Sequence, residues 1–370
     1  MKKIKFVRLD RDFAENKKKF FEIINKIGKT GNFILGKEVE NFEKKIKKLL
    51  NSKYVLAVSN ATDGLILSLK AIGIKENDEV LVPVNSFISS ASSVVACGAI
   101  PRFVDICACL NINFAKIEKK ITKKTKAIMP VHFAGKPAIM SEIIKIAKKY
   151  KLKIIEDCAQ AVGGKYKNKF VGTLGDIGCF SMHPLKNLNV YGDGGFITTN
   201  NKKYFKIISK LRNHGLEGNQ RDNPAIFGYN NRLDEIQAGL ANLKLRKLNS
   251  KNKKIIKIAR LYNKSFSKFC ITPNEDKESI HVYHRYIIQV KNRDNFIKYM
   301  KKKKIDCKIH YPKLLSEIKA YQKFFMDCDN FNESKKINMN IVSLPNYSEL
   351  KKDEVNYVIN KVVKYFKIHE

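Results

Sequence analysis

The stretch KYVLAVSNATDGLILSLKAIGIKENDEVLVPV, residues 53–84, decides the fold. It begins and ends with short apolar runs, and a helix-length apolar segment, GLILSLKAIG, separates them. Two strands joined through a helix normally lie parallel in one sheet, because the helix carries the chain back across the sheet face. The stretch therefore predicts one crossover unit of an α/β protein.

The same alternation continues as far as residue 199. Further strand-like runs, separated by helix-length connections, are IPRFVDI, KAIMPV, LKIIED, CFSM and GFITT. Continuous apolar runs are typical of parallel strands that are covered on both faces. We therefore predict an α/β large domain with a mostly parallel central sheet.

The chain changes character beyond this region. Residues 232–268 contain no proline and carry apolar residues at helical spacing, which predicts one or two long helices. After about residue 270 come the strand-like run HVYHRYIIQV, a lysine-rich helix near 294–304, the run IDCKIHYP and a final helix, KDEVNYVINKVVKYF. We predict a large domain over residues 1–250 and a smaller C-terminal α+β domain over residues 251–370.

Composition limits the class of protein. The chain has 370 residues, 44% of them hydrophobic, which is enough for a substantial core. No segment has the apolar length of a membrane span, and MKKIKFVRLDRDF lacks the apolar run of a secretion signal, so we expect a cytoplasmic protein. Cys107 and Cys109 have the spacing of neither a zinc site nor a redox motif, so we expect reduced thiols and no metal.

The formal net charge of +37 raises the question of nucleic-acid binding. The 72 lysines and arginines are spread over every segment and form no basic arm, and no recognition motif accompanies them. The same pattern is typical of a codon bias toward AT-rich triplets. We therefore expect no specific nucleic-acid partner.

Polar residues follow the predicted strands, where open parallel sheets bind ligands. The segment NATD, residues 60–63, precedes a helix whose amino terminus could hold a phosphate, or could simply be capped by Ser59, Asn60 or Thr62. Phe87 follows the next run and could lie on a ligand ring or pack in the core.

Two later strands end in groups that need a partner. Asp157, with Gln160 three residues on, follows LKIIED, and a buried carboxylate requires a cation or several donors. A protonated pyridine nitrogen or a helix amino terminus would satisfy it. Ser181 and Lys186 follow CFSM, within FSMHPLKNLNVYGDGGF (residues 180–196), where apolar and glycine neighbours predict an enclosed lysine.

Together these features indicate pyridoxal phosphate. They supply a phosphate-binding helix start, a stacking aromatic, an acid for the pyridine nitrogen, a second phosphate hydroxyl and a lysine for the imine. The lysine amine, with its pKa lowered by burial, could form the imine and then move a proton between the substrate and the cofactor.

The sequence resembles the DegT/DnrJ/EryC1/StrS family of sugar aminotransferases over nearly its whole length. The resemblance rests on GNFILGKEVENFEKKI, VSNATDGL, VPVNSFISS, IIEDCAQAVGG, GDIGCFSMHPLKN, GDGGFITTN, LRNHG, GYNNRLDEIQAGL, HYP and SLPNY. It implies fold type I of pyridoxal-phosphate enzymes and a homodimer with shared active sites.

The resemblance also implies a role for each matching residue. Lys186, in S-x-H-x-x-K, would hold the cofactor through an imine, and Ser181 would bind its phosphate together with Ala61 and Thr62. The remaining cofactor contacts it implies are Asp157 to the pyridine nitrogen, Gln160 to the phenolic oxygen, Phe87 on the ring face and Asn230 to the phosphate of the partner subunit.

Other positions are expected to touch substrate or to depart from the family. His310 and Tyr311 resemble a substrate-facing loop, and His183 belongs to the lysine motif but could equally be a packed, hydrogen-bonded histidine. Family members commonly carry aspartate in place of Ile139, and we expect this difference to affect helix capping more than chemistry.

Lys186 favours transamination, because family members that dehydrate their substrate carry histidine there. We expect transfer of an amino group from glutamate to a 3-keto or 4-keto nucleotide sugar, for the amino sugars of surface polysaccharides. VNSFISS and NNRLDE lean toward ring position 3. A small phosphorylated ketone is an alternative acceptor, and a non-enzymatic regulator or nucleic-acid-binding protein on the same fold is an alternative of another class.

Overall fold

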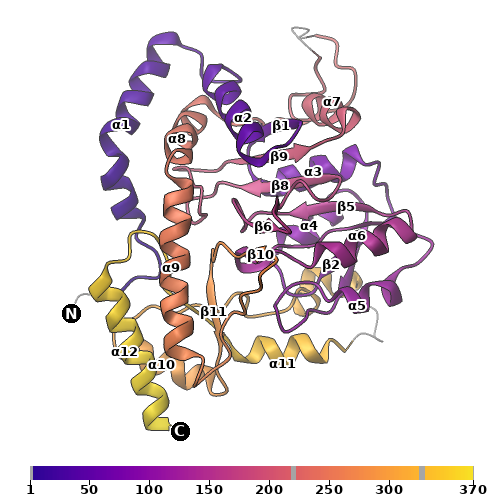
Figure 1. Ribbon diagram of the computed structural model, residues 1–370. Helices are drawn as coiled ribbons and strands as arrows, with labels where there is room; N and C mark the ends of the chain where they lie inside the picture. The colour runs from indigo at the N-terminus through magenta and orange to yellow at the C-terminus, as the bar shows by residue number, and fades with distance from the viewer. Residues whose placement is uncertain (1–2, 218–221, 325–329, 370) are drawn as a thin grey trace.

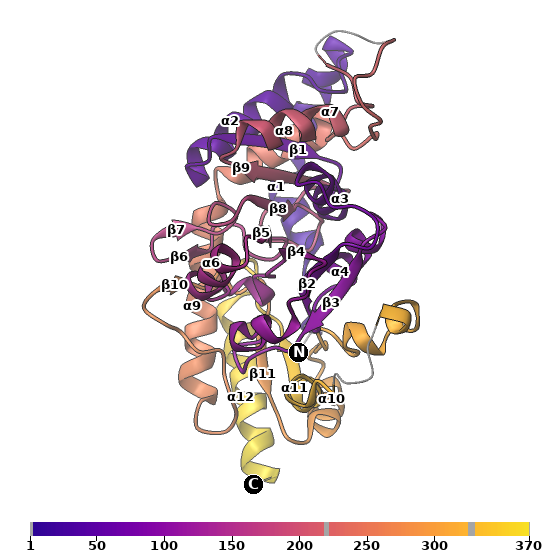
Figure 2. The same ribbon diagram turned by 90° about the vertical axis from the view of Figure 1, so that its right-hand side faces the viewer.

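A computed structural model describes residues 3–217, 222–324 and 330–369. A seven-stranded sheet with helices on both faces forms the large domain, and a smaller lobe is built around the far end of a long helix (Figures 1 and 2). The strands of the sheet, in spatial order, are β1 (Tyr54–Val58), β9 (Gly195–Thr199), β8 (Ile177–Ser181), β5 (Lys153–Asp157), β4 (Thr125–Ile128), β2 (Glu79–Pro83) and β3 (Ile100–Val104).

The sheet is mostly parallel, as predicted. Strands β8, β5, β4, β2 and β3 pair in parallel, and only β9 runs antiparallel to its neighbours β1 and β8. Each of the seven strand-like runs of the sequence overlaps one of these strands. The parallel strands therefore end at a common edge.

Alternation along the strands divides the core into two layers. Leu56 and Val58 of β1 pack in one hydrophobic cluster, whereas Val55 and Ala57 pack in another. Successive side chains of a strand point to opposite faces, so each cluster covers one face of the sheet. The helices of the first face are α3 (Ala61–Ala71), α4 (Ser89–Val95) and α7 (Lys202–Leu211), and those of the second are α2 (Lys37–Leu50), α6 (Met140–Lys149) and α8 (Glu235–Leu245).

The C-terminal lobe follows α9 (Leu248–Phe266). Its core contains an antiparallel strand pair packed against helices. The elements of the lobe are β11 (Tyr286–Gln289), β12 (Ile341–Leu344), α10 (Arg293–Lys302), α11 (Asn332–Asn340) and α12 (Lys352–His369). The domain boundary that we propose, near residue 250, lies in the first turn of α9.

The remaining elements complete the described chain. They are α1 (Leu9–Thr30), α5 (Phe114–Ile117), the short strands β6 (Lys165–Tyr166), β7 (Lys169–Phe170) and β10 (Ser279–Ile280), and the 3₁₀ turns Glu118–Lys120, Phe133–Gly135, Leu315–Glu317 and Lys319–Phe324. The N-cap of α6 is Ile139, which provides no side-chain hydrogen bond, as expected from its replacement of an aspartate.

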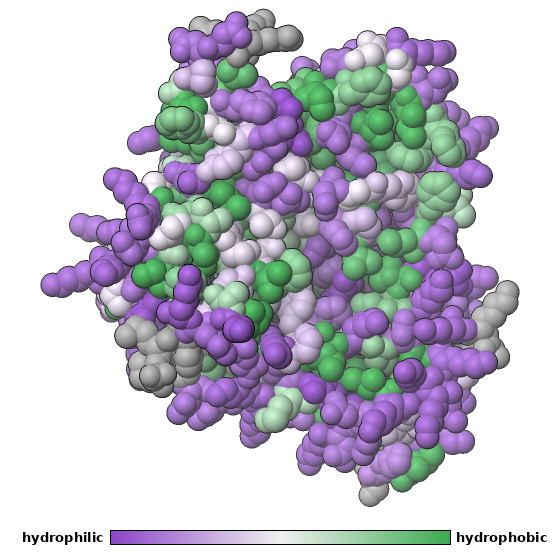
Figure 3. Space-filling view, turned by 180° about the vertical axis from the view of Figure 1, so that it is seen from behind, coloured by the Kyte–Doolittle hydropathy of each residue, from purple (hydrophilic) through white to green (hydrophobic). Residues whose placement is uncertain are grey.

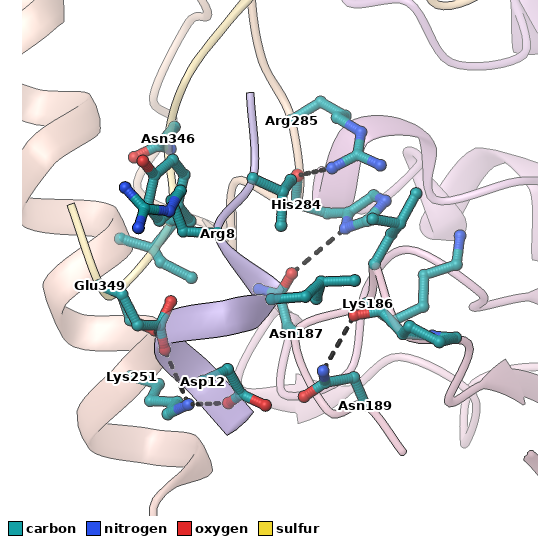
Figure 4. Close-up of a pocket in the computed structure, with 17 residues that line it drawn as sticks. Arg8, Asp12, Lys186, Asn187, Asn189, Lys251, His284, Arg285, Asn346 and Glu349 are labelled. Atoms are coloured by element: carbon teal, nitrogen blue, oxygen red, sulfur yellow. Dashed lines mark hydrogen bonds and ion pairs between the residues drawn. The ribbon is translucent and has the colours of Figure 1, made fainter. Parts of the chain in front are cut away.

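The amino-terminal segment crosses to the C-terminal lobe. Ile4 pairs with Ile305 and is buried in the core of the lobe. A buried ion network then fixes α1: the Asp12 carboxylate lies 2.5 Å from Nζ of Lys244 and 2.8 Å from Nζ of Lys251. Figure 4 shows Lys251 between Asp12 and Glu349, which it contacts at 2.8 Å. Because removing one partner would strand a buried charge, this network holds α1, α8, α9 and the lobe together.

One prediction about the second half of the chain needs correction. Within HVYHRYIIQV only the last part forms a strand, because Tyr283 adopts a left-handed backbone conformation with φ of 47° and interrupts the extended chain. The run IDCKIHYP, for which no element was predicted, contains isolated bridges at Ile305 and Lys308.

The expectation of reduced thiols is wrong for one pair. Cys107 and Cys109 form a disulfide, with their Cα atoms 5.2 Å apart. A tight turn, in which the Leu110 amide donates to the Cys107 carbonyl at 2.9 Å, brings the two side chains together. Cys97, Cys158, Cys179 and Cys307 are free thiols. Among the described residues, no helix is both long and apolar enough to cross a membrane.

Candidate active site

A cavity of about 590 Å³ lies at the carboxyl edge of the parallel strands, against the C-terminal lobe. The residues that the sequence singled out meet there, with the exception of Asn230. Its lining includes Ala61, Thr62, Phe87, Asp157, Gln160, Ser181, His183, Lys186, Arg285, His310 and Tyr311. The edge of the sheet thus brings together residues that are far apart in the sequence.

The amino terminus of α3 forms one end of the cavity. The Asn60 side chain caps this helix by accepting the Asp63 amide at 2.9 Å, so the capping interpretation is confirmed, yet the adjoining residues Ala61 and Thr62 still line the cavity. A Cβ atom at Gly195 would lie 2.7 Å from the Asn60 carbonyl carbon and 3.0 Å from the Ala61 nitrogen. Glycine is required at 195 because the helix start rests on its backbone.

Asp157 lies buried at the end of β5. Its carboxylate accepts hydrogen bonds from Ser90 Oγ at 2.9 Å and from the Ala159 amide at 3.1 Å. Burial raises the pKa of this carboxyl group, while the two hydrogen bonds and the charge of Lys186 act in the opposite direction. No helix begins directly after β5, so Asp157 is not a helix cap. A cationic ligand atom would complete its environment.

The residue before Asp157 has a structural task. The Glu156 carboxylate accepts the Gly172, Leu174 and Gly175 amides at 2.7–2.8 Å and contacts His132 Nε2 at 3.0 Å. His132, Glu156 and Cys158 are close enough to hold a metal ion. The histidine and the carboxylate are nevertheless used in hydrogen bonds, so this cluster reads as the support that fixes the end of β5.

Lys186 reaches the cavity from the loop between β8 and β9. Burial, reinforced by the nearby charge of Arg285, lowers the pKa of its amine to about 8, while Asp157 acts to raise it. The amine therefore loses its proton much closer to neutral pH than an ordinary lysine, and only the neutral amine is a nucleophile.

Aromatic and polar side chains also line the cavity. Phe87 is 49% exposed, with its ring centroid 5.7 Å from that of Tyr311, so it is not a core residue. Gln160 receives the Ala134 amide at 2.7 Å and donates Nε2 to the Tyr311 hydroxyl at 3.4 Å. His310, whose pKa is lowered by burial to about 3, lies beside Tyr311 and is neutral at neutral pH.

Two further sequence-predicted residues are exposed. His183 is exposed at the cavity mouth, and its Nδ1 accepts the Leu185 amide at 3.3 Å. Asn230 lies outside the cavity, exposed, in a bridge to Asn213.

Sequence reasoning missed Ser90 and Arg285. Ser90 lies in VNSFISS, where a cofactor role was assigned to Phe87 alone, although a hydroxyl in a helix that follows a strand end could have been read as a partner for Asp157. Arg285 was read as one position of a strand. An arginine between the apolar residues of HVYHRYIIQV is a signal that could have found it, because arginine is rarely buried without a purpose.

The residues of the cavity fit pyridoxal phosphate. The α3 amino terminus and Ser181 offer hydrogen-bond donors to a phosphate, and the buried Asp157 carboxylate has no ion-pair partner in the described part of the chain. Lys186, with its lowered pKa, lies in the same cavity and supplies the amine.

A mostly parallel α/β sheet that brings an anion site, a buried carboxylate and a lysine nucleophile to one edge defines a pyridoxal-phosphate-dependent enzyme. The model of the DegT/DnrJ/EryC1/StrS aminotransferase family matches residues 14–363. The chain belongs to this family.

Two curated relatives illustrate the range of the family. The chain is 38% identical over 365 residues to dTDP-3-amino-3,6-dideoxy-alpha-D-galactopyranose transaminase of Aneurinibacillus thermoaerophilus, covering 98% of this chain and 99% of the relative. It is 34% identical over 305 residues to 3-oxo-glucose-6-phosphate:glutamate aminotransferase of Bacillus subtilis, covering 79% of this chain and 67% of the relative.

Solved structures agree in fold and cofactor. DesV of S. venezuelae, in complex with a ketimine intermediate, superposes with a TM-score of 0.96 at 28% identity, covering 99% of both chains. NtdA of Bacillus subtilis, with bound cofactor PMP, superposes with a TM-score of 0.93 at 29% identity, covering 99% of this chain and 86% of that one. The enzyme is a pyridoxal-phosphate-dependent aminotransferase of fold type I.

The lowered pKa of Lys186 leads us to predict how cofactor binding depends on pH. The rate at which the apoprotein combines with pyridoxal phosphate is expected to rise with pH, with a midpoint near 8, because deprotonation produces the nucleophile. The charged and titratable groups around the amine are Arg285, Asp157, His183, His284 and His310.

Stopped-flow absorbance against pH measures this midpoint. Arg285→Gln should move it upward, since a cation that disfavours the protonated amine is removed, and Asp157→Asn should move it downward. Arg260→Gln, a change at an exposed arginine paired with Glu275, is the control and should leave it unchanged. A midpoint near 10.5 in the unmodified protein would contradict the assignment of a desolvated amine.

Proposed function

We propose that this enzyme moves the amino group of glutamate to the keto group of a nucleotide-linked keto-deoxy sugar, in the synthesis of amino sugars for surface polysaccharides. The observation that carries the proposal is Lys186, present in one cavity with Asp157 and Ser181. Transamination needs an amine at this position both to hold the cofactor and to move protons.

The residues that line the cavity each have a task in this proposal. When bound, pyridoxal phosphate supplies the carbonyl that receives the amino group and a ring that withdraws electrons from the reacting carbon. Asp157 keeps a positive charge on the ring nitrogen, and Ser181 with the α3 amino terminus holds the phosphate. Phe87 covers one face of the ring and keeps water from it.

Lys186 also acts as the acid and base. Its amine removes the proton from the α-carbon of the donor in the first half-reaction and returns a proton to the sugar carbon in the second. A pKa of about 8 suits both directions, because protonated and neutral forms coexist near neutral pH. His183, His310 and Tyr311 border the space in which we propose that the sugar binds.

We also propose a cytoplasmic homodimer with shared active sites. Exposed apolar side chains support an interface: Phe227 is fully exposed and Tyr229 is 39% exposed, immediately before Asn230. Phe21 and Phe33 are about half exposed, and apolar side chains gather over the region of α1 and α2 in Figure 3. Large exposed apolar patches mark interaction sites, and in this proposal Asn230 reaches the phosphate of the partner subunit.

The acceptor is the least constrained part of the proposal. The Aneurinibacillus relative is named for a 3-amino sugar, which favours ring position 3. The Bacillus relative is named for 3-oxo-glucose-6-phosphate and glutamate, so a small phosphorylated ketone is the second candidate acceptor. The same relative supports glutamate as the donor.

A substrate panel tests this proposal. Purified holoenzyme is incubated with glutamate and either 3-keto and 4-keto nucleotide sugars or keto-sugar phosphates, and 2-oxoglutarate formation is measured. We expect turnover with a 3-keto nucleotide sugar. Turnover with keto-sugar phosphates alone would transfer the assignment to the second candidate.

A regulator or nucleic-acid-binding protein on the same fold is the candidate of another class. A binding module has no need for Lys186, Asp157 and Ser181 in one cavity, which argues against it. Gel-shift measurements over a salt series discriminate: binding that vanishes near physiological salt marks a nonspecific effect of the net charge.

A further inference from the structure

Arg285 is a cation of the active site that the proposed steps do not use. It lies between Tyr283, where the backbone turns left-handed, and β11, and it lines the cavity that contains Lys186. The Arg285 amide donates to the Ala134 carbonyl at 3.2 Å, which fixes this turn against the large domain. Figure 4 shows the side chains of Arg285 and Lys186 in the same view of this region.

The guanidinium of Arg285 is poorly satisfied within the chain. Its Nη1 donates to the His284 carbonyl at 3.2 Å, and its Nε is buried without a hydrogen-bond partner. The Phe6 ring lies 5.2 Å from the guanidinium carbon. The described part of the chain places no carboxylate in an ion pair with Arg285, and burial lowers its pKa to about 10.

The surroundings make this charge costly. The titratable side chains that interact with its charge are Tyr311, the second cation Lys186, and three histidines whose pKa values burial and Arg285 lower, namely His183, His284 and His310. A desolvated guanidinium without a counter-ion is strongly unfavourable, and two cations that share a cavity repel each other. The wall of the cavity beside Lys186 is therefore complementary to an anion.

The position of the anion limits its identity. In an amino acid the carboxylate is bonded to the carbon that carries the amino group, so it must lie beside the lysine that acts on that carbon. In a nucleotide sugar the diphosphate is bonded to carbon 1, and in a sugar phosphate the ester lies on carbon 6. Both are separated by ring atoms from a reacting carbon at position 3 or 4.

We propose that Arg285 binds the α-carboxylate of the amino donor and thereby selects an α-amino acid over other amines. The inference rests on the proposed function, in which glutamate and the sugar react in turn at Lys186. The planar guanidinium binds a carboxylate through two parallel hydrogen bonds, which orients the α-carbon as well as holding it. Arg285 is a specificity-determining residue of the donor half-reaction.

Its contribution is separable from that of the cofactor site. The phosphate end of the cavity is formed by α3 and Ser181, and the ring nitrogen end by Asp157, none of which contacts Arg285 in the described structure. Removing the guanidinium should therefore leave the phosphate and ring contacts of the cofactor intact, and above the Lys186 midpoint its main effect should fall on the ligand that carries the carboxylate.

The first test compares donors with and without the α-carboxylate. Holoenzyme and its Arg285→Gln variant are mixed with glutamate or with 4-aminobutyrate, which is glutamate without that carboxylate, and the change in cofactor absorbance is followed. Arg285→Gln should lower kcat/KM for glutamate by about 100-fold and leave 4-aminobutyrate nearly unchanged, since a buried charge-assisted pair is lost. Arg285→Lys should recover part of the loss.

The second test does not depend on turnover. Calorimetric titration of the pyridoxal form with 2-oxoglutarate, which cannot react with it, should give binding about 100-fold weaker in Arg285→Gln than in the unmodified holoenzyme. Arg260→Gln, at an exposed arginine in α9, is the matched control and should bind normally. Equal binding by all three proteins, or no binding to the unmodified holoenzyme, overturns the inference.

The two tests separate this inference from the proposed function. If glutamate fails to change the cofactor absorbance of the unmodified enzyme, glutamate as donor is wrong, and the calorimetric comparison still decides the role of Arg285. If Arg285→Gln instead impairs the half-reaction of the keto sugar and spares that of glutamate, the anion belongs to the acceptor and the inference is wrong.

Discussion

Lys186→Ala is expected to lower turnover by several orders of magnitude and to leave the fold intact. The change removes at once the nucleophile that holds the cofactor and the group that moves protons. The phosphate and ring contacts come from other residues, namely Asp157, Ser181 and the amino terminus of α3. Pyridoxamine phosphate should therefore still bind to the variant.

Three measurements check this result. Steady-state assays give the loss of turnover, circular dichroism reports the fold, and borohydride reduction followed by peptide mass analysis shows whether the cofactor is attached at residue 186. Lys167→Ala is the matched control, because Lys167 is half exposed and lies 3.4 Å from Glu278 in a surface ion pair. Such changes alter stability by about half a kcal/mol or less.

A single outcome would remove the assignment of the site. If Lys186→Ala kept near-normal amino transfer while Lys167→Ala lost it, the cavity would not be the place of the reaction, and Asp157 and Ser181 would lose their proposed roles with it.

Asp157→Asn is expected to reduce turnover by about 10²–10⁴-fold. The amide retains the size of the carboxylate and can still accept the Ser90 hydroxyl, but it cannot stabilise a positive charge on the cofactor ring. Loss of that charge weakens the electron withdrawal on which removal of the α-proton depends. Both half-reactions should slow together, unlike the donor-specific effect expected at Arg285.

Single-turnover kinetics of each half-reaction test this prediction. Asp294→Asn is the control, because the Asp294 side chain is 74% exposed in the first turn of α10. Cofactor attachment at Lys186 should persist in Asp157→Asn. Wild-type rates in both half-reactions of Asp157→Asn would exclude it as the partner of the ring nitrogen.

The sequence by itself determined the sheet and most of the cavity. Strand periodicity is a local property, so β1, β2 and β5 could be read from short apolar runs. Parallel strands end at one edge, and this rule was enough to group Asp157, Ser181 and Lys186 before any contact was known. The residues next to Asp157, Ser181 and Lys186 in the sequence were enough to mark each one as a candidate site residue.

The tertiary structure decided the features that depend on distant segments. His310 and Tyr311 were expected near substrate only by resemblance, and it is the packing of the C-terminal lobe that brings them to Phe87. The Cys107–Cys109 disulfide depends on a tight turn that residue spacing does not specify. Cofactor contacts across a homodimer, proposed for Asn230, likewise depend on a second chain.

Arg285 shows most clearly why part of the site could not be predicted from the sequence. Its sequence context predicts a strand, in which alternate residues would point to opposite faces. The left-handed turn at Tyr283 and the hydrogen bond to Ala134 instead place it in the cavity beside Lys186. Local periodicity follows from neighbouring residues, whereas the electrostatic environment of a buried charge is set by groups a hundred residues away. That environment, and the anion that it requires, emerged only from the fold.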